Sequence, residues 1–337
     1  MWYVSFAGGA GGVNNILVYH DSGRPHARPE LLPTGKDDPP LQELRGFAIA
    51  GSLLYVVNAH NSLSQVLVYE KDEGGGDRGG DHCPYRFKAV FASMAEVSSL
   101  VHPYDLTFDE QGNCYVSSQD TNVITGLGTA GSVLEVAAHL RELYPPPHAF
   151  LVGTRVASSL GLLPGIQVPH PPDVGVPHGL AVGFEDETRT RVAHSVRGVV
   201  CHAGHLYVAD EPADAVKVYD GETGKFCGQI AGDALRAPVQ LLLDAGGVLY
   251  IGSSGNDRVM CYDLAQGAPA GTVEPRTFIH GKVKHVSGMA FDAQGNFYAA
   301  ERKKKRIMKF GPGGSGDGVE FIGGLPDEPE FILHVPK

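Results

Sequence analysis

The pattern of apolar and polar positions along this chain repeats itself. Three stretches, residues 196–219, 238–262 and 286–310, align with one another, the first being one residue shorter at its first hairpin. Each reads as an apolar strand, a tight turn, a second strand with a tyrosine, a polar stretch and a third strand that ends in an aromatic residue. Twelve positions separate the two aromatic residues in every copy. A fixed period of this kind indicates a repeat architecture.

Further copies of the repeat cover residues 44–69 and about 103–127. The chain begins in mid-repeat, since residues 2–5 read as a second strand and residues 16–19 as a third. The missing first strand is found at residues 329–335. Counting from Pro329 to the C-terminus and on from Met1 to Tyr3 gives eleven steps, as does Leu44 to Tyr55. We therefore expect the terminal strands to complete one blade together.

Closure of a ring has a physical reason, because it leaves only short and protected sheet edges. Turn signals agree with hairpins between the first and second strands, at residues 109–113, 244–247 and 292–296, where Gly and Asn tolerate positive φ. The sequence predicts an all-β fold, a six-bladed β-propeller that forms a single domain over residues 1–337.

The repeats resemble NHL repeats. The resemblance rests on residues 288–292 followed by 295–300, and on residues 206–210 followed by 216–219. It implies a six-bladed propeller of a broad superfamily, which includes amidating lyases, gluconolactonase-like and paraoxonase-like hydrolases, strictosidine-synthase-like enzymes and RNA- or protein-binding modules. Because one fold hosts many functions, the function has to be argued from the site.

One interval breaks the period. Tyr115 and Tyr207 are 92 residues apart, whereas 43 to 60 residues separate the other neighbouring tyrosines of this column. The extra residues fall within about 138–194, between the third and fourth blades. We expect an inserted lid there, with a degenerate seventh blade as the alternative, because long inserts in compact domains are usually functional or disordered.

Composition limits the partners. The formal net charge is −11, which argues against a general nucleic-acid binder, and the basic run at residues 302–306 reads as a solvated hairpin loop. No apolar run is long enough for a membrane helix, and the N-terminus lacks the features of a signal peptide. The five cysteines are scattered and lack a paired spacing, which favours a reducing compartment, and we expect a cytoplasmic protein.

Propeller geometry predicts where chemistry is located. The residues that open each first strand and close each second strand converge at one mouth of the central channel, here called the top. Polar types vary from blade to blade at these positions, which suggests a specific ligand. The residues expected to bind it are Glu43, Arg45, His60, Asp120, Gln240, Glu301 and Glu330.

Two mechanisms fit this rim. In the first, His102, Tyr104, Asp105 and Arg197 are catalytic, with His102 as general acid or base and the arginines as a clamp for a carboxylate or lactone. In the second, a divalent metal is held by histidines, namely His102, His178 and His285. Residues 176–182 are similar to the Pro-His-x-Leu-Ala segment in which amidating lyases carry a zinc ligand, which is what places His178 in the set.

Zinc and calcium are the metals considered, calcium being a candidate for the carboxylates and asparagines of the rim. The sequence predicts a hydrolase or lyase that acts on a small organic substrate under the insert. The alternative is a non-catalytic platform of the NHL type that binds a protein or peptide at the same face.

Overall fold

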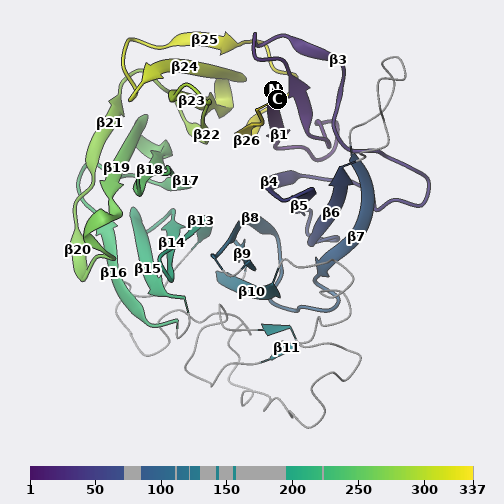
Figure 1. The fold of residues 1–337 in the computed structure, drawn as a ribbon, viewed down its shortest axis with the longest axis horizontal. Helices are drawn as coiled ribbons and strands as arrows, with labels where there is room; N and C mark the ends of the chain where they lie inside the picture. Colours follow the sequence, from purple (N-terminus) through teal and green to yellow (C-terminus); the bar gives the residue numbers. More distant parts are fainter. Residues whose placement is uncertain are drawn as a thin grey trace.

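The computed structural model describes residues 1–71, 85–110, 112–120, 122–129, 142–143, 155–156, 195–221 and 224–336. Six sheets radiate from a central channel, five of them antiparallel and one with a parallel strand added at its edge (Figure 1). The six-bladed β-propeller expected from the repeats is therefore confirmed.

We designate the blades A to F. Blade A comprises β26 (Pro329–His334), β1 (Trp2–Phe6), β2 (Leu17–Tyr19) and β3 (Pro25–Glu30), and blade B comprises β4 (Leu44–Ala50), β5 (Leu53–Asn58), β6 (Gln65–Lys71) and β7 (Tyr85–Ser93). Blade C contains β8 (Pro103–Phe108), β9 (Asn113–Ser118) and β10 (Val123–Thr129). Blade D contains β13 (Val196–His202), β14 (His205–Asp210), β15 (Ala215–Asp220) and β16 (Phe226–Ala231), with β20 (Gly271–Val273) added in parallel.

Blade E comprises β17 (Pro238–Leu243), β18 (Val248–Ser253), β19 (Arg258–Asp263) and β21 (Arg276–His280), and blade F comprises β22 (Val286–Phe291), β23 (Asn296–Glu301), β24 (Arg306–Pro312) and β25 (Val319–Ile322). Within the described residues, helical structure is limited to the single turns η2 (Ser254–Asn256), η3 (Leu264–Gln266) and η4 (Arg302–Lys304). In the same part of the chain, no helix has the length and apolarity that a membrane crossing requires.

The N- and C-terminal strands close the ring in blade A, as predicted. β26 pairs with β1 in antiparallel register, with Trp2 opposite His334 and Val4 opposite Ile332. The two ends of the chain lie side by side in Figure 1, and Met1 donates a hydrogen bond to the carbonyl of Val335. Blade A therefore joins residues more than 300 positions apart.

The tyrosines of the repeat have a structural role in three blades. Each hydroxyl donates a hydrogen bond to the aspartate that opens the preceding hairpin turn. The bonds are Tyr115 to Asp109 (3.0 Å), Tyr250 to Asp244 (3.1 Å) and Tyr298 to Asp292 (3.0 Å). This contact explains why turn and tyrosine recur together, and it confirms the three predicted hairpins.

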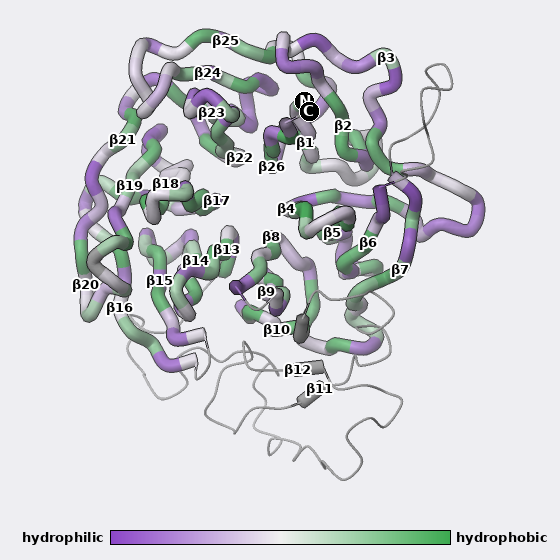
Figure 2. Tube along the Cα trace, viewed as in Figure 1, coloured by the Kyte–Doolittle hydropathy of each residue, from purple (hydrophilic) through white to green (hydrophobic). Residues whose placement is uncertain are grey.

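The hydrophobic core lies between neighbouring blades. Hydrophobic positions concentrate in the strands, whereas β3 and the connecting loops are largely hydrophilic (Figure 2). Trp2 of blade A, for example, packs against Tyr298 of blade F, with the rings tilted and 4.0 Å between their centroids. Burial of such surfaces, at roughly 25 cal/mol per Å², holds each blade to the next.

The predicted insert, residues 138–194, lies between blades C and D. Within it the structure describes only β11 (Glu142–Leu143) and β12 (Arg155–Val156), which pair with each other. The choice between a lid and a seventh blade, the role of His178 and the environment of Cys83 lie outside the described residues. The other four cysteines are free thiols.

Candidate functional site

The predicted top rim is built by one repeated backbone contact. In all six blades the backbone N–H of the residue after the second strand donates a hydrogen bond to the carbonyl of the residue immediately before the first strand. The acceptors, in order from blade A to blade F, are Glu328, Glu43, His102, Ser195, Ala237 and His285. Four of them, Glu43, His102, Ala237 and His285, have positive φ. The aligned rim positions of the sequence therefore lie at equivalent places around the channel.

Each first strand also departs from regular pairing just after it begins. Such β-bulges re-aim side chains and are frequent near functional sites. The first residue of each irregular segment is Arg45, Tyr104, Arg197, Val239, Ser287 or Glu330, and the next is Gly46, Asp105, Gly198, Gln240, Gly288 or Phe331. These two positions supply many of the polar and charged side chains described below.

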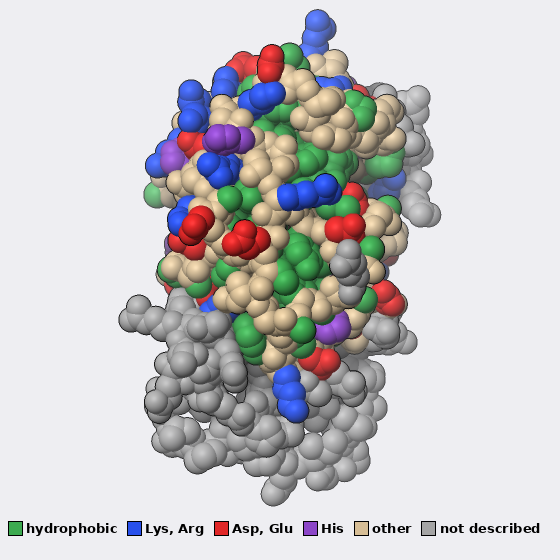
Figure 3. Space-filling model, turned by 90° about the vertical axis from the view of Figure 1, so that its left-hand side faces the viewer, with side chains coloured by type: hydrophobic (Ala, Val, Ile, Leu, Met, Phe, Trp, Pro, Cys, Tyr) green, Lys and Arg blue, Asp and Glu red, His purple; other side chains and the backbone are tan. Residues whose placement is uncertain are grey.

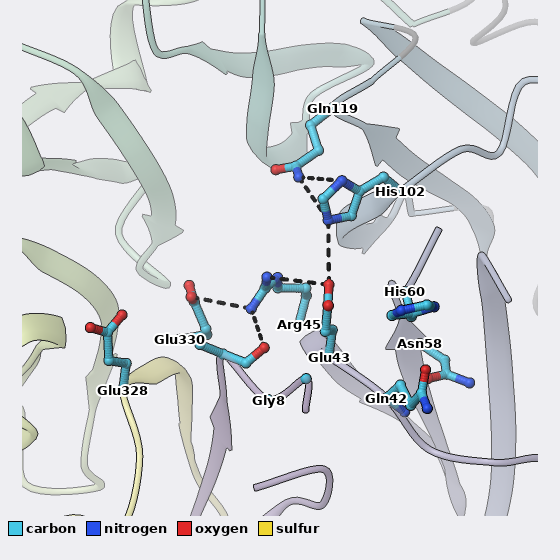
Figure 4. A network of polar contacts seen from close by, with 12 residues as sticks. Gly8, Gln42, Glu43, Arg45, Asn58, His60, His102, Gln119, Glu328 and Glu330 are labelled. Atoms are coloured by element: carbon cyan, nitrogen blue, oxygen red, sulfur yellow. Dashed lines mark hydrogen bonds and ion pairs between the residues drawn. The ribbon is translucent and has the colours of Figure 1, made fainter. Parts of the chain in front are cut away.

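A network of charges crosses the top half of the channel. Glu330 is 1% exposed, and its Oε1 lies 3.2 Å from Arg45 Nη1 and 2.9 Å from Arg302 Nη2. Arg45 also lies 3.8 Å from Glu43, which in turn lies 3.7 Å from His102 (Figure 4). A nearly buried carboxylate thus links guanidinium groups from blades B and F.

His102 sits between carboxylates. Its Nδ1 lies 3.2 Å from Asp120, and its Nε2 lies 3.7 Å from Glu43, beyond hydrogen-bond length. The side-chain nitrogen of Gln119 contacts the ring, at 2.8 Å from Nδ1 and 3.0 Å from Nε2 (Figure 4). The His102 side chain remains 18% exposed, so its ring is oriented and still reaches the surface.

Arg197 and Tyr104 form a second contact of the rim. The guanidinium carbon of Arg197 lies 5.2 Å from the centroid of the Tyr104 ring, in cation–π geometry. Glu211 accepts from Arg197 Nε at 2.7 Å and pairs with Nη2 at 2.6 Å. Tyr104 is 3% exposed, and burial, reinforced by the charge of Glu330, raises its pKa well above that of free tyrosine.

Three arginines and five carboxylates make up these contacts. They are Arg45, Arg197 and Arg302, with Glu43, Asp120, Glu211, Glu328 and Glu330. The arginines are each paired, and the most exposed side chains are those of Asp120 (46%), Arg302 (42%), Glu328 (37%) and Glu211 (34%), three of them acidic. The mouth therefore carries more carboxylates than guanidinium groups. Below it, Tyr104 and the ion pairs of Glu330 fill the centre of the channel.

Asp105 and Gln240 occupy the next position of the bulges and line a cavity on the other side of this network. The Asp105 carboxylate accepts hydrogen bonds from the backbone N–H of Leu106 (2.8 Å) and of Val199 in blade D (3.2 Å). Burial raises the pKa of Asp105 to about 7, although both hydrogen bonds oppose the shift. Asp105 thus joins two blades, and its carboxyl group faces away from the top rim.

The remaining predicted site residues lie apart from the network. Glu301 is fully buried and pairs with Arg306 of β24, which directs it along the blade. His60 contacts Ser62 in its own turn at 2.8 Å, and Figure 4 shows its ring away from the linked side chains. The backbone N–H of His285 donates to Asp257 at 3.0 Å.

The predicted metal site combines His102, His285 and His178. His178 lies outside the described residues. Within the described part of the chain, no three His, Cys, Asp or Glu side chains are grouped as a metal site would require. His102 itself contacts carboxylates and an amide, as described above.

Sequence reasoning missed Arg302, which it placed in a solvated basic loop. Arg302 Nε lies 2.9 Å from Glu328, without the alignment of a hydrogen bond, and its Nη2 pairs with Glu330. Its position directly after a second strand is the signal that could have revealed it. Figure 3 shows the side of the molecule at the left of Figure 1, around β19 and β20, where basic, acidic and hydrophobic side chains are interspersed.

Comparison with known proteins finds similarity of fold and no match by sequence. The chain matches no protein-family model and no curated protein sequence. A chain of a nidogen/laminin complex is similar in structure, with a TM-score of 0.54 and 14% identity over 98% of this chain and 97% of that chain.

Virginiamycin B lyase from Staphylococcus aureus, in a catalytically inactive form with quinupristin, has a TM-score of 0.48 and 10% identity over 86% of this chain and 73% of that chain. A streptogramin B lyase has a TM-score of 0.47 and 10% identity over 97% and 74%. At such identities the similarities concern the fold alone.

Proposed function

We propose that this protein is a lyase or hydrolase for a small polar molecule, with its active site at the top mouth of the channel and His102 as the general acid and base. The observation that carries the proposal is the placement of His102, whose Nδ1 lies 3.2 Å from Asp120 while the ring stays partly exposed. A histidine oriented by a carboxylate is the usual arrangement for proton transfer near neutral pH.

In this mechanism Nδ1–H of His102 donates a hydrogen bond to the Asp120 carboxylate, which leaves the lone pair on Nε2. In a lyase reaction a substrate C–H that displaces the Gln119 amide gives its proton to Nε2, and its electron pair forms a C=C bond as the bond to the leaving group breaks. In a hydrolysis a water at the same place gives the proton and its oxygen bonds to the substrate carbon. In both, Asp120 stabilises the imidazolium, and His102 then returns the proton to the leaving group as it departs. Positioned proton transfer of this kind contributes roughly 10²- to 10⁴-fold in rate.

Arg197 is suited to stabilise negative charge that develops on the substrate. Glu211 holds its Nε and Nη2, which leaves the Nη1 edge without a hydrogen bond among the described residues. A guanidinium fixed on the ring of Tyr104 is preorganised, so it lowers the energy of an oxyanion without reorganising first. Because the edge of the mouth is acidic, we expect the part of the substrate that lies there to be neutral or positively charged.

A panel of aryl esters and lactones, followed by acid release in a weakly buffered indicator solution, tests the proposal. We expect turnover of at least one member, and a loss of about 10²-fold or more in kcat for His102→Ala. His205→Ala is the matched control, because His205 lies at the hairpin between β13 and β14, where its Nδ1 is 2.9 Å from the Ala203 carbonyl of the same turn. Turnover that survives His102→Ala contradicts the proposal, and no turnover of any member contradicts its hydrolase form.

The second candidate is a docking platform for a basic peptide at the same mouth. It is favoured by the exposed acidic side chains at the mouth, Asp120 and Glu211. A lysine-rich peptide measured by fluorescence anisotropy tests it. Binding that weakens in Asp120→Lys, with no turnover of the ester and lactone panel, selects this function.

A further inference from the structure

The channel is hollow on the side away from the proposed active site. A cavity of about 960 Å³ lies among the halves of the first strands that are nearer the hairpin turns. It opens between the hairpin turns of blades E and F, near Asp244 and Asp292. We call it the hairpin-side cavity. Its volume falls in the range of sites that enclose small organic ligands.

Hydrophobic residues from all six blades line this cavity, together with the polar residues Thr107, Asp244, Asp292 and His334. Every blade contributes a hydrophobic side chain, namely Ile332, Phe47, Leu106, Val199, Leu242 and Met289 in order from blade A to blade F. Among the described residues that line it there is no lysine or arginine. Such walls favour an uncharged ligand body and disfavour an anion, which would lose its hydration without gaining a cation.

The inner end of the cavity is polar. Gln240 lies there on the bulge of β17, only 6% exposed. Its Oε1 is buried without a hydrogen-bond partner, and no bond of its Nε2 is found within the described residues. A buried polar group of this kind is destabilising, and one retained in a native structure calls for an explanation.

Asp105 lies at the same inner end. It receives the N–H of Val199, and the preceding residue, Gly198, approaches the Cα of Gln240 so closely that a Cβ there would lie 3.0 Å from it. Asp105 and Gln240 therefore flank one segment of blade D. A ligand head group at the end of the cavity would meet both side chains.

Glycines make room for this arrangement. Around the ring, the second bulge position alternates between a glycine and a larger residue: Gly46, Asp105, Gly198, Gln240, Gly288, Phe331. A Cβ on Gly46 would lie 2.5 Å from Asp105 Oδ1, and one on Gly288 would lie 3.0 Å from the Glu330 carbonyl. Three close approaches thus place three larger side chains together at the end of the cavity.

We propose that the hairpin-side cavity is a binding site for an uncharged, largely apolar molecule that bears a hydroxyl group, which hydrogen-bonds to the Gln240 amide. A hydroxyl can donate to Oε1 and accept from Nε2 at once, so it satisfies both ends of the amide whichever way the amide is turned. The apolar body fills the space between the six blades. This site is independent of the activity proposed for the top mouth.

Three probes of one shape test the proposal: 2-naphthol, naphthalene and 2-naphthoate, each titrated by fluorescence against the full chain. We expect saturable binding of 2-naphthol, about five- to tenfold tighter than naphthalene, with 2-naphthoate weakest. In Gln240→Met, which keeps the length of the side chain and removes the amide, 2-naphthol should weaken about five- to tenfold while naphthalene stays within twofold.

Two further variants locate the binding. Leu242→Trp fills the cavity and should weaken both neutral probes at least tenfold, whereas His102→Ala at the top mouth should change neither. The proposal is overturned if 2-naphthol shows no saturable binding, if it binds no tighter than naphthalene, or if Gln240→Met leaves their difference intact. Should Leu242→Trp fail to fold, the comparison in Gln240→Met decides alone.

Discussion

The two halves of the central channel are formed by the same six strands and hold opposite contents. The top half contains paired charges, centred on Glu330, and ends in an acidic mouth. The hairpin-side half is a cavity that hydrophobic residues of all six blades line, with Asp105 and Gln240 at its inner end and no lysine or arginine among its described lining residues. Each first strand runs from the top mouth to its hairpin turn, so the second position of each bulge lies further from the top than the first. Arg45, Tyr104 and Glu330 join the top network, whereas Asp105, Gln240 and Phe331 line the cavity.

The division has an energetic meaning. Charges in the top half are stable only because each guanidinium has a carboxylate, and removal of one partner leaves a buried charge unpaired. The cavity depends on shape, because its glycines allow backbones to approach one another. The top half should therefore respond to changes of charge, and the hairpin-side half to changes of volume.

The largest effect is expected from Glu330→Gln, which leaves Arg45 and Arg302 without their shared carboxylate. The free energy of unfolding should fall by about 3–5 kcal/mol, measured by urea denaturation. Glu328→Gln is the matched control, since the Glu328 side chain is 37% exposed and pairs with the same Arg302; its loss should be below about 1 kcal/mol. Equal losses in the two variants would mean that burial of Glu330 does not set its contribution.

The pH dependence of stability should report on Asp105. Its folded pKa of about 7 lies above the ordinary carboxyl value of 3.8, so the folded state binds the proton more tightly. The contribution of Asp105 to the free energy of unfolding is complete below about pH 4. It is lost as the pH rises to about 7, a change of up to about 4 kcal/mol. Asp105→Asn should flatten this slope relative to the wild type, whatever its absolute stability. An unchanged slope between pH 4 and pH 7 would assign the titration elsewhere.

Gly198→Ala tests the role of shape in the hairpin-side half. The added Cβ would lie 2.8 Å from Leu241 N and 2.9 Å from the Val239 carbonyl, both of them backbone atoms that cannot move aside alone. We expect a loss of about 1–3 kcal/mol in the free energy of unfolding. Gly246→Ala is the control, because its Cβ would meet only the Asp244 side chain, at 3.2 Å. Similar stability of both variants would show that blades D and E can separate without cost.

The smallest effect on stability is expected from Asp120→Asn. The Asp120 side chain is 46% exposed, and its contact with His102 is close to solvent, so the free energy of unfolding should change by less than about 1 kcal/mol. Thermal unfolding measures this change, and a shift as large as that of Glu330→Gln would make Asp120 a structural residue. The proposed activity, in contrast, should fall in this variant, because His102 loses the carboxylate that orients it.

Much of the fold could be predicted because its signals are local. The spacing of Tyr250 from its hairpin aspartate recurs because the two side chains bond each other, so turn, strand and tyrosine are visible in any one copy of the repeat. The rim positions followed from the alignment of these copies. His102, Glu43 and Arg45 were expected near one another and are joined in one network.

Other parts of the site could not be predicted. Glu301 and Arg302 are neighbours in the sequence, yet the first is buried against Arg306 within blade F and the second reaches the channel. Asp105 and Gln240 were assigned to the top mouth, and the structure places them in the cavity on the hairpin side. A one-residue difference at a bulge decides the direction of a side chain, and the repeat pattern does not contain it.

The sequence by itself determined the number of blades, the closure by both termini and the circle of residues at the top, because these depend on periodicity and on turn chemistry within each copy. The tertiary structure decided how the channel is used. The pairing of Arg45 with Glu330 joins residues 285 positions apart, and the cavity exists only where six strands converge. Both arise from contacts between blades, and energies of burial and pairing depend on neighbours that no single repeat specifies.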